Sequence, residues 1–454
     1  MKKNRLRLWL SKRRIALSPT QIIAITFALI ILIGALLLTT PAASQNGVSC
    51  GFLPALFTAT SSTCVTGLVM FDTGSQWSAF GQVVIITMIE IGGLGFMSMA
   101  SLVIFAFRRK VGLRQRMLMA QALSVNEMEG VVTLQKWVLG GSLSIQAIAA
   151  LVLFFRFLPQ YGVGKALWYG VFHAISAFCN AGFDIFGFGD SLVQFNSDPV
   201  VCITLMILVA VGGLGFFVWE EVARVRRFKK FSVYTKLVLI ASLVLTVGGA
   251  ALIALVEWNN PDTLGTMGIG DKILNSLFQS VTIRTAGFDS IGQGSMTDAG
   301  KAVSMALMIV GGSSGSTAGG IKTVTIVVLM LFLWSRARGR STVCVFKRTV
   351  PAEKVMDAMT IVGIVVGLAF FGGLFITATS PISFTDGLYE AVSAIATVGL
   401  TTGVTTSLSI PAQIMIILYM YFGRVGVLTI SLGFMMGDRS EERFRYAQTN
   451  LLIG

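Results

Sequence analysis

Four short segments rich in glycine and hydroxyl residues interrupt a chain that is otherwise strongly apolar, and they constrain its fold more than any other feature. The first is SSTCVTGLVMFD at 61–72, between two stretches long enough to cross a bilayer. Of the 454 residues, 54% are hydrophobic and 12% are charged, whereas about a quarter of a soluble domain is charged. The run at 21–40 supplies the ~20 apolar residues that a spanning helix needs, and it exceeds a ~7–15-residue signal core. We therefore expect an integral membrane protein.

The glycine-rich segment recurs as part of a repeat of more than a hundred residues. The four copies are FTATSSTCVTGL (57–68), FHAISAFCNAGF (172–183), FQSVTIRTAGF (278–288) and YEAVSAIATVGL (389–400), whose aligned glycines are Gly67, Gly182, Gly287 and Gly399. A second glycine signature follows each copy, at Gly92, Gly212, Gly311 and Gly423, after 25, 30, 24 and 24 residues. Internal repetition of two signatures in the same order indicates one structural unit used four times.

Each repeat is predicted to be a helix, a re-entrant pore loop and a second helix. We expect an all-α polytopic membrane protein with four pseudo-symmetric helix–pore loop–helix repeats around one central pore, and eight spanning helices. The predicted outer helices are 20–40, 137–157, 234–257 and 357–378, and the inner ones are 81–107, 199–223, 300–335 (interrupted) and 409–436. The predicted units are a basic tail (1–19), repeat 1 (20–107, pore loop 51–70), repeat 2 (137–223, pore loop 166–186), repeat 3 (234–335, pore loop 272–291), repeat 4 (357–436, pore loop 384–403) and a second tail (437–454).

The net charge of +14 is distributed by topology. Basic clusters lie at 2–14, 108–110, 224–230 and 336–348, whereas 41–80 and 380–408 contain no Lys or Arg. This alternation follows the positive-inside rule. It predicts that both termini are cytoplasmic, in the plasma membrane, with the basic residues contacting membrane lipid rather than nucleic acid.

Enzyme chemistry has no support in the residue inventory. The five cysteines are scattered without a CxxC pair, and the single histidine, His173, has apolar neighbours. No disulfide framework, metal site or Ser/His/Asp constellation can be assembled from them, and no cofactor is expected. The GGLGF motifs lack the βαβ context of a phosphate-binding loop, so we interpret them as helix-packing surfaces, and His173 as a hydrogen-bonding residue.

Non-helical backbone at membrane depth is tolerated where it lines a water-filled path. Four such segments on one axis could present carbonyl oxygens that replace the hydration shell of a monovalent cation. The candidate selectivity-filter residues are Thr63, Cys64, Val65, Thr66, Gly67, Cys179, Asn180, Ala181, Gly182, Thr285, Ala286, Gly287, Ala396, Thr397, Val398 and Gly399. Asp72, Asp184 and Asp289 follow three of the glycines and could attract cations to the outer mouth.

The four loops resemble those of the Trk/Ktr/HKT superfamily of potassium transporters, and the chain is most similar to the Ktr-type bacterial membrane subunit. The resemblance implies potassium uptake, with potassium as the permeating ion and sodium as a further ion on which transport depends. Glycine at all four filter positions is the potassium-preferring pattern of that superfamily. It also implies a homodimer with one pore per protomer and a cytosolic nucleotide-binding regulatory ring, for which 108–136, 224–236 and 438–454 are the candidate contact surfaces.

The segment GGSSGSTAGGIKT (311–323) resembles the intramembrane gating loop of that superfamily, and its glycines and serines cannot sustain a straight helix. The candidate gate residues are Gly311, Gly312, Ser313, Ser314, Gly315, Ser316, Thr317, Ala318, Gly319, Gly320 and Arg424. The alternative for the loop is a helix-packing surface of small residues. For Arg424, a charge within a spanning segment, the alternative is an ion pair with Glu90 or another buried acid.

Two further cations near these segments are open to interpretation. Lys322 either contributes to the gate or faces the cytoplasm. Arg284 is expected to brace the third filter segment against a neighbouring acid.

Three other functions stay open. The first is a sodium-permeable or Na⁺/K⁺-cotransporting member of the same superfamily. The second is an organic-solute carrier, which would more commonly show inverted halves with broken helices. The third is a membrane scaffold, which has no use for four glycine-ended loops.

Overall fold

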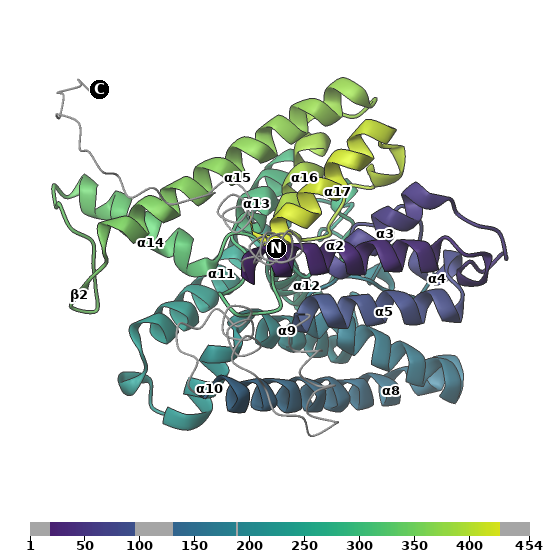
Figure 1. Ribbon diagram of the computed structural model, residues 1–454, viewed down its shortest axis with the longest axis horizontal. Coiled ribbons are helices and arrows are strands. Elements are labelled where there is room, and N and C mark those ends of the chain that lie inside the picture. The colour runs from purple at the N-terminus through teal and green to yellow at the C-terminus, as the bar shows by residue number, and fades with distance from the viewer. Residues whose placement is uncertain (1–18, 96–129, 188, 427–454) are drawn as a thin grey trace, which may run out of the picture.

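The structure is a computed structural model that describes residues 19–95, 130–187 and 189–426, and the regular secondary structure of this part of the chain is almost entirely helical (Figure 1). The helices are α2 (Pro19–Leu38), α3 (Phe52–Cys64), α4 (Thr73–Gln76), α5 (Ala79–Leu94), α8 (Val131–Phe178), α9 (Pro199–Leu214), α10 (Phe216–Val225), α11 (Val233–Glu257), α12 (Ile269–Thr282), α13 (Asp298–Met308), α14 (Thr323–Ala337), α15 (Ala352–Thr379), α16 (Phe384–Ile395) and α17 (Ile410–Val425). Short 3₁₀ turns are η1 (Pro41–Ala43), η2 (Val193–Phe195), η3 (Phe228–Lys230), η4 (Gln293–Ser295) and η5 (Thr405–Ser407). Strands β1 (Cys344–Val345) and β2 (Arg348–Thr349) pair antiparallel beyond α14.

The helices fall into four consecutive groups: α2–α5, α8–α10, α11–α14 and α15–α17. Each group contains a short helix that leads into one glycine-rich segment, and we call these the loop helices: α3, the second half of α8, α12 and α16. The second loop helix begins after Gly162, whose φ of 72° and ψ of 171° break α8 into two helices. Group-to-group packing follows chain order, with α5 on α8, α9 on α12, α13 on α16 and α17 on α3. The last contact returns to the first group, so the four groups close a ring.

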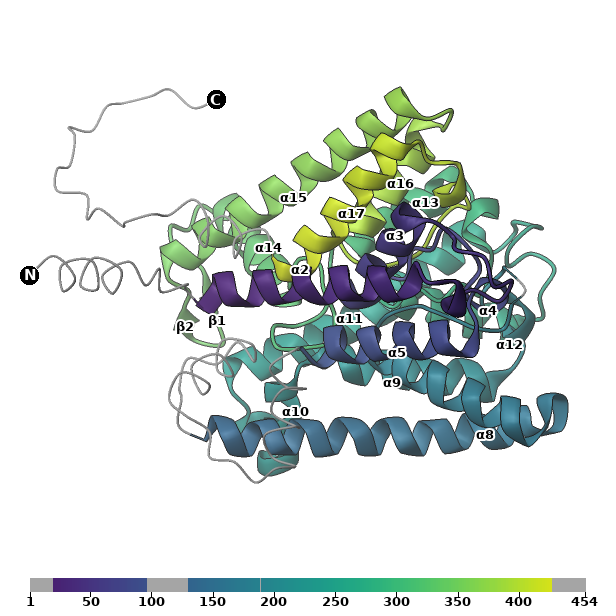
Figure 2. The ribbon, with the colours of Figure 1, turned by 45° about the vertical axis from the view of Figure 1, so that its right-hand side comes forward.

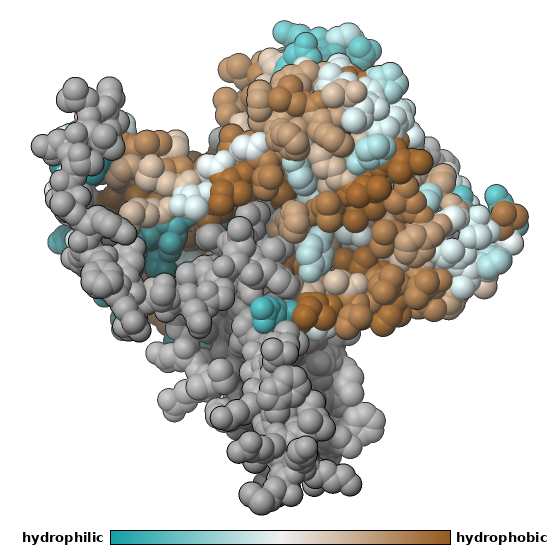
Figure 3. All heavy atoms as spheres, turned by 45° about the horizontal axis from the view of Figure 1, so that its top comes forward, coloured by the Kyte–Doolittle hydropathy of each residue, from teal (hydrophilic) through white to brown (hydrophobic). Residues whose placement is uncertain are grey.

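Length and hydropathy mark four helices as membrane spans, namely α2, α8, α11 and α15. The helices α5, α14 and α17 are apolar but shorter, and α9 and α10 form a pair bent by 95°. On the face shown in Figure 3, apolar side chains cover much of the described surface and hydrophilic ones gather toward its edges, and large apolar side chains are exposed along α2, α8, α11 and α15. The described part of the chain is therefore a helical bundle with several spans, and its long helices run in broadly the same direction (Figure 2).

The predicted outer helices correspond to α2, the first half of α8, α11 and α15, with shifts at their ends. The prediction of one continuous inner helix at 199–223 is wrong, because the helix ends at Leu214 and a new one starts at Phe216. Between them Gly215 has φ 93° and ψ 139°, a backbone conformation that a helix cannot contain. The interruption predicted within 300–335 lies between Met308 and Thr323. The predicted helical residues 96–107 and 427–436 lie outside the described residues.

Seven of the described helices begin at a serine, threonine or aspartate whose side-chain oxygen accepts a hydrogen bond from a backbone N–H of the first turn. These residues are Asp72 (α4), Ser78 (α5), Asp198 (α9), Ser232 (α11), Thr297 (α13), Ser383 (α16) and Ser409 (α17). Such a cap contributes about 1 kcal/mol. The polar residues between apolar runs therefore determine where the helices start.

Candidate ion pathway

The four aligned glycines lie in one closed ring. An added Cβ would lie 2.5 Å from the carbonyl oxygen of Ala181 at Gly67, 2.5 Å from that of Ala286 at Gly182, 2.5 Å from that of Val398 at Gly287, and closer still to that of Thr66 at Gly399. Each glycine therefore faces the carbonyl of the residue that precedes the next glycine, and the fourth returns to the first. No side chain fits at these positions without displacing a neighbouring backbone, which explains glycine in all four repeats.

The backbone of the four glycine-rich segments repeats as closely as their sequence. The glycines have φ between 68° and 100°, and the residue two positions before each is left-handed although it is not glycine. These residues are Val65 (φ 57°), Asn180 (61°), Thr285 (69°) and Thr397 (51°). A left-handed residue with a side chain costs roughly 1–2 kcal/mol, and such strain gathers at functional sites. Four equivalent strained positions indicate that one backbone conformation is imposed on all four segments.

A hydroxyl on each loop helix holds the end of the segment that follows. In the first and fourth segments, the backbone N–H of Gly67 and of Gly399 donates to Ser61 Oγ and Ser393 Oγ, each at 3.0 Å. In the second and third, Ser176 Oγ and Thr282 Oγ1 donate to the carbonyl oxygens of Phe183 and Phe288, each at 2.7 Å. Sequence reasoning missed these four residues. The signal that could have found them is a hydroxyl six residues before the glycine, or five in the shortened third copy.

The hydroxyls of Thr63, Thr66 and Thr397 are buried and have no hydrogen-bond partner in the described part of the chain. An unpaired hydroxyl in an apolar setting costs about 1–3 kcal/mol, so each is available to a ligand or to water. All three lie on the predicted filter segments. The ring therefore carries unused oxygen atoms in addition to its carbonyls.

A cavity of ≈ 490 Å³ opens on one side of the ring and is lined by all four glycines. Its wall contains the three acids predicted at the mouth, Asp72, Asp184 and Asp289, and also Asp190, which sequence reasoning missed. Asp289 accepts hydrogen bonds from the backbone N–H groups of Ile291, Gly292 and Gln293, at 3.1, 3.0 and 3.0 Å. Four carboxylates in one concave wall produce a negative potential that concentrates cations.

A second cavity of ≈ 280 Å³ lies beside the interrupted segment and is lined by both Lys322 and Arg424. The same wall includes Gly92, Gly93 and parts of the predicted gate, namely Gly315, Ser316, Ala318 and Gly320. The segment 311–320 also reaches the ring, because an added Cβ at Gly320 would lie 3.0 Å from the carbonyl oxygen of Ala396. The predicted filter and the predicted gate are therefore in contact.

Carbonyl groups of the second group of helices anchor the segment 311–320. The backbone N–H groups of Ser313 and Thr317 donate to Gly213 O and Gly212 O, at 3.0 and 3.2 Å. Thr317 Oγ1 donates to Phe178 O, at the end of the second loop helix, at 3.0 Å.

The starts of α10 and α11 supply two further contacts to the same segment. Phe216 N donates to Gly315 O at 2.8 Å, and Tyr234 OH donates to Ser314 O at 3.2 Å. The break at Gly215, which sequence reasoning missed, therefore lies directly against the predicted gate.

The side chain of Arg424 joins the same segment to the first group of helices. Its guanidinium donates to Thr317 O and Gly92 O, and to Gly93 O at 3.1 Å. The alternative of an ion pair with Glu90 is wrong, because no carboxylate lies within 4.0 Å of Arg424 in the described part of the chain. Glu90 instead accepts hydrogen bonds from Gln146 Nε2 at 3.1 Å and Cys179 Sγ at 3.2 Å. Lys322 does not simply face solvent, since its Nζ donates to Ala318 O at 2.9 Å.

Two other sequence expectations have different outcomes. Arg284 was expected to pair with an acid, but among the described residues its guanidinium contacts Ser242 O, Ser242 Oγ and Thr246 Oγ1, at 3.4–3.5 Å. That expectation is wrong, because α11 offers hydroxyls and a carbonyl there. His173 is fully buried, its Nδ1 lies 2.7 Å from Tyr169 O, and its ring stacks on Phe186 at 4.2 Å. The expected hydrogen bond is therefore present at Nδ1, whereas Nε2 has no partner among the described residues. Of the candidate contact surfaces, 108–129 and 438–454 lie outside the described residues.

The GGLGF motifs are packed tightly, as the sequence predicts. A Cβ on Gly93 would lie 2.6 Å from Cys179 Sγ, and one on Gly212 would lie 2.8 Å from Thr317 Oγ1. The last glycine of each motif ends its helix, Gly95 with φ 83° and Gly215 with φ 93°. The motifs therefore both pack helices and terminate them.

Comparison with known proteins identifies the family. A model of the TrkH cation transport protein family matches residues 8–446. The chain is 40% identical over 427 residues to the Ktr system potassium uptake protein B of Bacillus subtilis, covering 94% of this chain and 95% of that protein. It is 38% identical over 443 residues to the potassium/sodium uptake protein NtpJ of Enterococcus hirae, covering 96% and 98%. The fold is similar to the crystal structure of the potassium transporter TrkH from Vibrio parahaemolyticus, with a TM-score of 0.71 at 16% identity over 92% of this chain and 86% of that chain.

These matches confirm the resemblance found in the sequence and the expectation of a transporter rather than an enzyme. They agree with the several apolar spans of the structure, so the protein crosses the membrane more than once. The closed ring of glycines, the acidic cavity and the segment 311–320 are therefore features of a chain that matches a cation transport family. The protein is a member of the TrkH family of cation transport proteins.

Proposed function

We propose that the protein takes up potassium ions across the plasma membrane, as the pore-forming subunit of a Ktr-type system. Two relatives that align over nearly their whole length support the choice of ion, since their names are Ktr system potassium uptake protein B and potassium/sodium uptake protein NtpJ. The observation that carries the proposal is the closed ring of four glycines, each against a carbonyl of the next segment. A ring of backbone carbonyls is the arrangement that replaces the hydration shell of potassium.

The path runs from the acidic cavity, through the ring, to the cavity lined by Lys322 and Arg424. An ion concentrated by the carboxylates gives up water to the carbonyls that precede the glycines. It then meets the segment 311–320, which acts as the gate and is held in place by Arg424 and by Gly212 and Gly213. An inside-negative potential supplies about 2.3 kcal/mol per charge per 100 mV, so the chain itself needs no hydrolysis step.

The four groups of helices form four pseudo-symmetric repeats, with α5, α9–α10, α13–α14 and α17 as the inner spans of an eight-span bundle. The ring-closing contacts of successive groups support this arrangement. The alternation of basic and charge-poor segments supports cytoplasmic termini and an external position for the acidic cavity. The site residues are those of the ring and its segments, 63–67, 179–182, 285–287 and 396–399, with the gate at 311–320 and Arg424.

A homodimer and a cytosolic nucleotide-binding regulatory ring complete the proposed assembly. The name of the Bacillus relative, a component of a Ktr system, supports the presence of a partner. Sodium enters as a second candidate ion, because the Enterococcus relative is named for both potassium and sodium. In this second reading the chain is a sodium-permeable or Na⁺/K⁺-cotransporting member of the same family.

Growth of an uptake-deficient bacterial strain on limiting potassium tests the proposal. We expect the wild-type chain to restore growth, alone or with a regulatory ring subunit, and Gly287→Ala to abolish it, because the added Cβ would lie 2.5 Å from Val398 O. Gly248→Ala is the matched control, since an added Cβ there meets nothing within 4 Å. A chain that reaches the membrane with its ring partner and still fails to restore growth would refute potassium uptake. Sodium influx through the wild-type chain that is comparable to its potassium influx would favour the second reading.

A further inference from the structure

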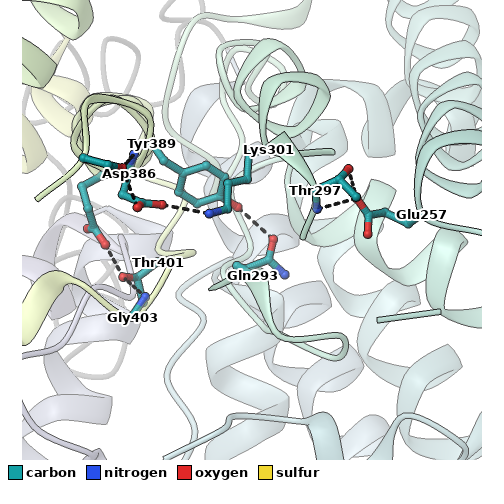
Figure 4. Close-up of polar contacts among 10 residues, drawn as sticks. Glu257, Gln293, Thr297, Lys301, Asp386, Tyr389, Thr401 and Gly403 are labelled. Carbon is teal, nitrogen blue, oxygen red and sulfur yellow. Dashed lines mark hydrogen bonds and ion pairs between the residues drawn. The ribbon is translucent and has the colours of Figure 1, made fainter. Parts of the chain in front are cut away.

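A buried glutamine joins the third and fourth groups of helices behind the ring. Gln293 is 1% exposed and starts the turn η4, six residues after Gly287. Figure 4 shows its side chain directed toward Tyr389, which belongs to the loop helix α16 and is fully buried. Polar side chains that are buried inside a protein, as these two are, almost always have hydrogen-bond partners.

All four hydrogen-bonding positions of the Gln293 amide are occupied. Its Nε2 donates to Asp289 Oδ1 at 2.7 Å and to Gln279 Oε1 at 3.1 Å. Its Oε1 accepts from Gln279 Nε2 at 2.5 Å and from Tyr389 OH at 2.8 Å. A primary amide has two donor hydrogens and two acceptor lone pairs, so this residue is saturated. A fully satisfied buried network specifies a single arrangement of the groups it joins.

The three partners come from elements that position the ring. Gln279 lies on the loop helix α12, eight residues before Gly287. Asp289 lies two residues after Gly287 and lines the outer cavity. Tyr389 lies on the loop helix α16, which leads to Gly399. The amide thus connects the helix that enters the third segment, the turn that leaves it and the helix that enters the fourth.

The same region contains a second link between these two groups. Lys301 Nζ on α13 and Asp386 Oδ1 on α16 form an ion pair at 3.0 Å (Figure 4). Lys301 and Asp386 are 12% and 22% exposed, so this ion pair is largely shielded from solvent and ties α13 to α16. The Gln293–Tyr389 contact is the link that, through Gln279, includes the loop helix α12 as well as α16.

We propose that Gln293 and Tyr389 are positioning residues for ion selectivity, which hold the third and fourth segments of the ring at the separation that favours potassium over sodium. The inference rests on the proposed function and deepens it. Carbonyl oxygens discriminate these ions through the size of the site and through the number and field of the oxygens. The size of the site and the arrangement of its oxygens both depend on a fixed distance between facing segments, which for these two segments is the distance between Gly287 and Gly399.

Tyr389→Phe tests the inference, because it removes one oxygen atom and leaves the aromatic ring of the side chain in place. We would reconstitute the full-length chain, with the regulatory ring if flux requires it, into vesicles and measure K⁺ and Na⁺ influx separately. The expected result is a fall of about threefold to tenfold in the K⁺/Na⁺ flux ratio, the range set by one buried hydrogen bond. Sodium flux rises while the maximal potassium flux is largely kept.

Tyr419→Phe is the matched control. Its hydroxyl also makes one hydrogen bond to one acceptor, Leu368 O at 2.6 Å, but it joins α17 to α15 away from the ring. We expect a similar loss of thermal stability in both variants and an altered flux ratio only in Tyr389→Phe. Gln293→Leu should lower the ratio further, and the double variant should add little to it, because both changes break one network. If Gln293→Leu fails to fold, the flux ratio of Tyr389→Phe still tests the proposed role in selectivity.

An unchanged flux ratio in Tyr389→Phe, with the protein folded, would overturn the selectivity role and leave potassium uptake intact. An equal change in Tyr419→Phe would overturn it as well, since a general loosening of the bundle would then explain the effect. Absence of potassium flux in the wild-type vesicles would instead refute the proposed function, and the inference with it.

Discussion

Replacing Thr317 by valine removes one hydrogen-bond donor of the proposed gate. Thr317 is fully buried, and its Oγ1 donates to Phe178 O at the end of the second loop helix, at 3.0 Å, with Asn180 Oδ1 as a more distant acceptor at 3.4 Å. Valine has nearly the same shape, so the packing of the side chain is kept. The backbone N–H of residue 317 still donates to Gly212 O.

The size of the effect follows from that single bond. A neutral buried hydrogen bond contributes about 0.5–1.5 kcal/mol net, and 1.4 kcal/mol corresponds to a factor of ten in an equilibrium constant. If the segment leaves Phe178 O when it opens, the substitution destabilises only the closed state. The open fraction should therefore rise by about twofold to tenfold.

Potassium influx into vesicles measures that fraction. We expect an initial rate about twofold to tenfold above that of the wild type, in the absence of any regulatory ligand. Thr26→Val is the control, because Thr26 Oγ1 donates to Ile22 O within α2 at 2.7 Å, outside the gate. An unchanged or lower rate in folded Thr317→Val protein would refute the idea that this segment must separate from the second loop helix for ions to pass.

Three further predictions test other parts of the path. Arg424→Gln removes charge-assisted hydrogen bonds worth about 1.5–3 kcal/mol each, one of them to Thr317 O, so potassium influx without a regulatory ligand should rise at least tenfold; a fall would assign Arg424 to holding the path open. Burial, together with the negative charge of Asp72, raises the pKa of Asp184 to about 7, so Asp184 is ionised above that pH and loses its charge below it. Uptake at low potassium should therefore decrease as the external pH falls from about 8 to 6, whereas Asp184→Asn should be low and nearly flat across that range; an unaltered profile would contradict a role for this carboxyl. Gly215→Ala places a side chain at φ 93°, which costs about 1–2 kcal/mol, and should lower the Tm in detergent by a few degrees relative to Gly140→Ala, whose added Cβ meets nothing within 4 Å.

The repeat, the family and the four glycines of the ring could all be predicted from the sequence, because each rests on local pattern. Gly67 and its three counterparts are followed at similar distances by a second glycine signature, and the aromatic residue that starts each segment fixes the alignment. Helix boundaries at Ser78 or Asp198 also follow local rules, since capping involves only the first turn. These features need no knowledge of which segments meet in space.

The partners of individual side chains could not be predicted, because they depend on contacts between distant segments. Arg424 donates to carbonyls more than a hundred and more than three hundred positions away, and Arg284 meets hydroxyls on α11 instead of an acid. The bend at Gly215 was missed for a different reason. The GGLGF motif has the composition of a helix-packing surface, and only its backbone angles show that it also ends the helix.

The central claim is that four glycine-ended segments form one potassium path, and ion flux through Gly399→Ala protein tests it most directly. The added Cβ would overlap the carbonyl of Thr66, at the contact that closes the ring, whereas the control Gly363→Ala on α15 adds a Cβ with nothing within 4 Å. In vesicles that contain the full-length chain, with a regulatory ring subunit added if flux requires one, the account predicts potassium flux well above sodium flux for the wild type and for Gly363→Ala. It predicts loss of flux, or loss of the preference for potassium, for Gly399→Ala. Selective potassium flux that survives in folded Gly399→Ala protein would contradict the account, because the ions would then pass elsewhere.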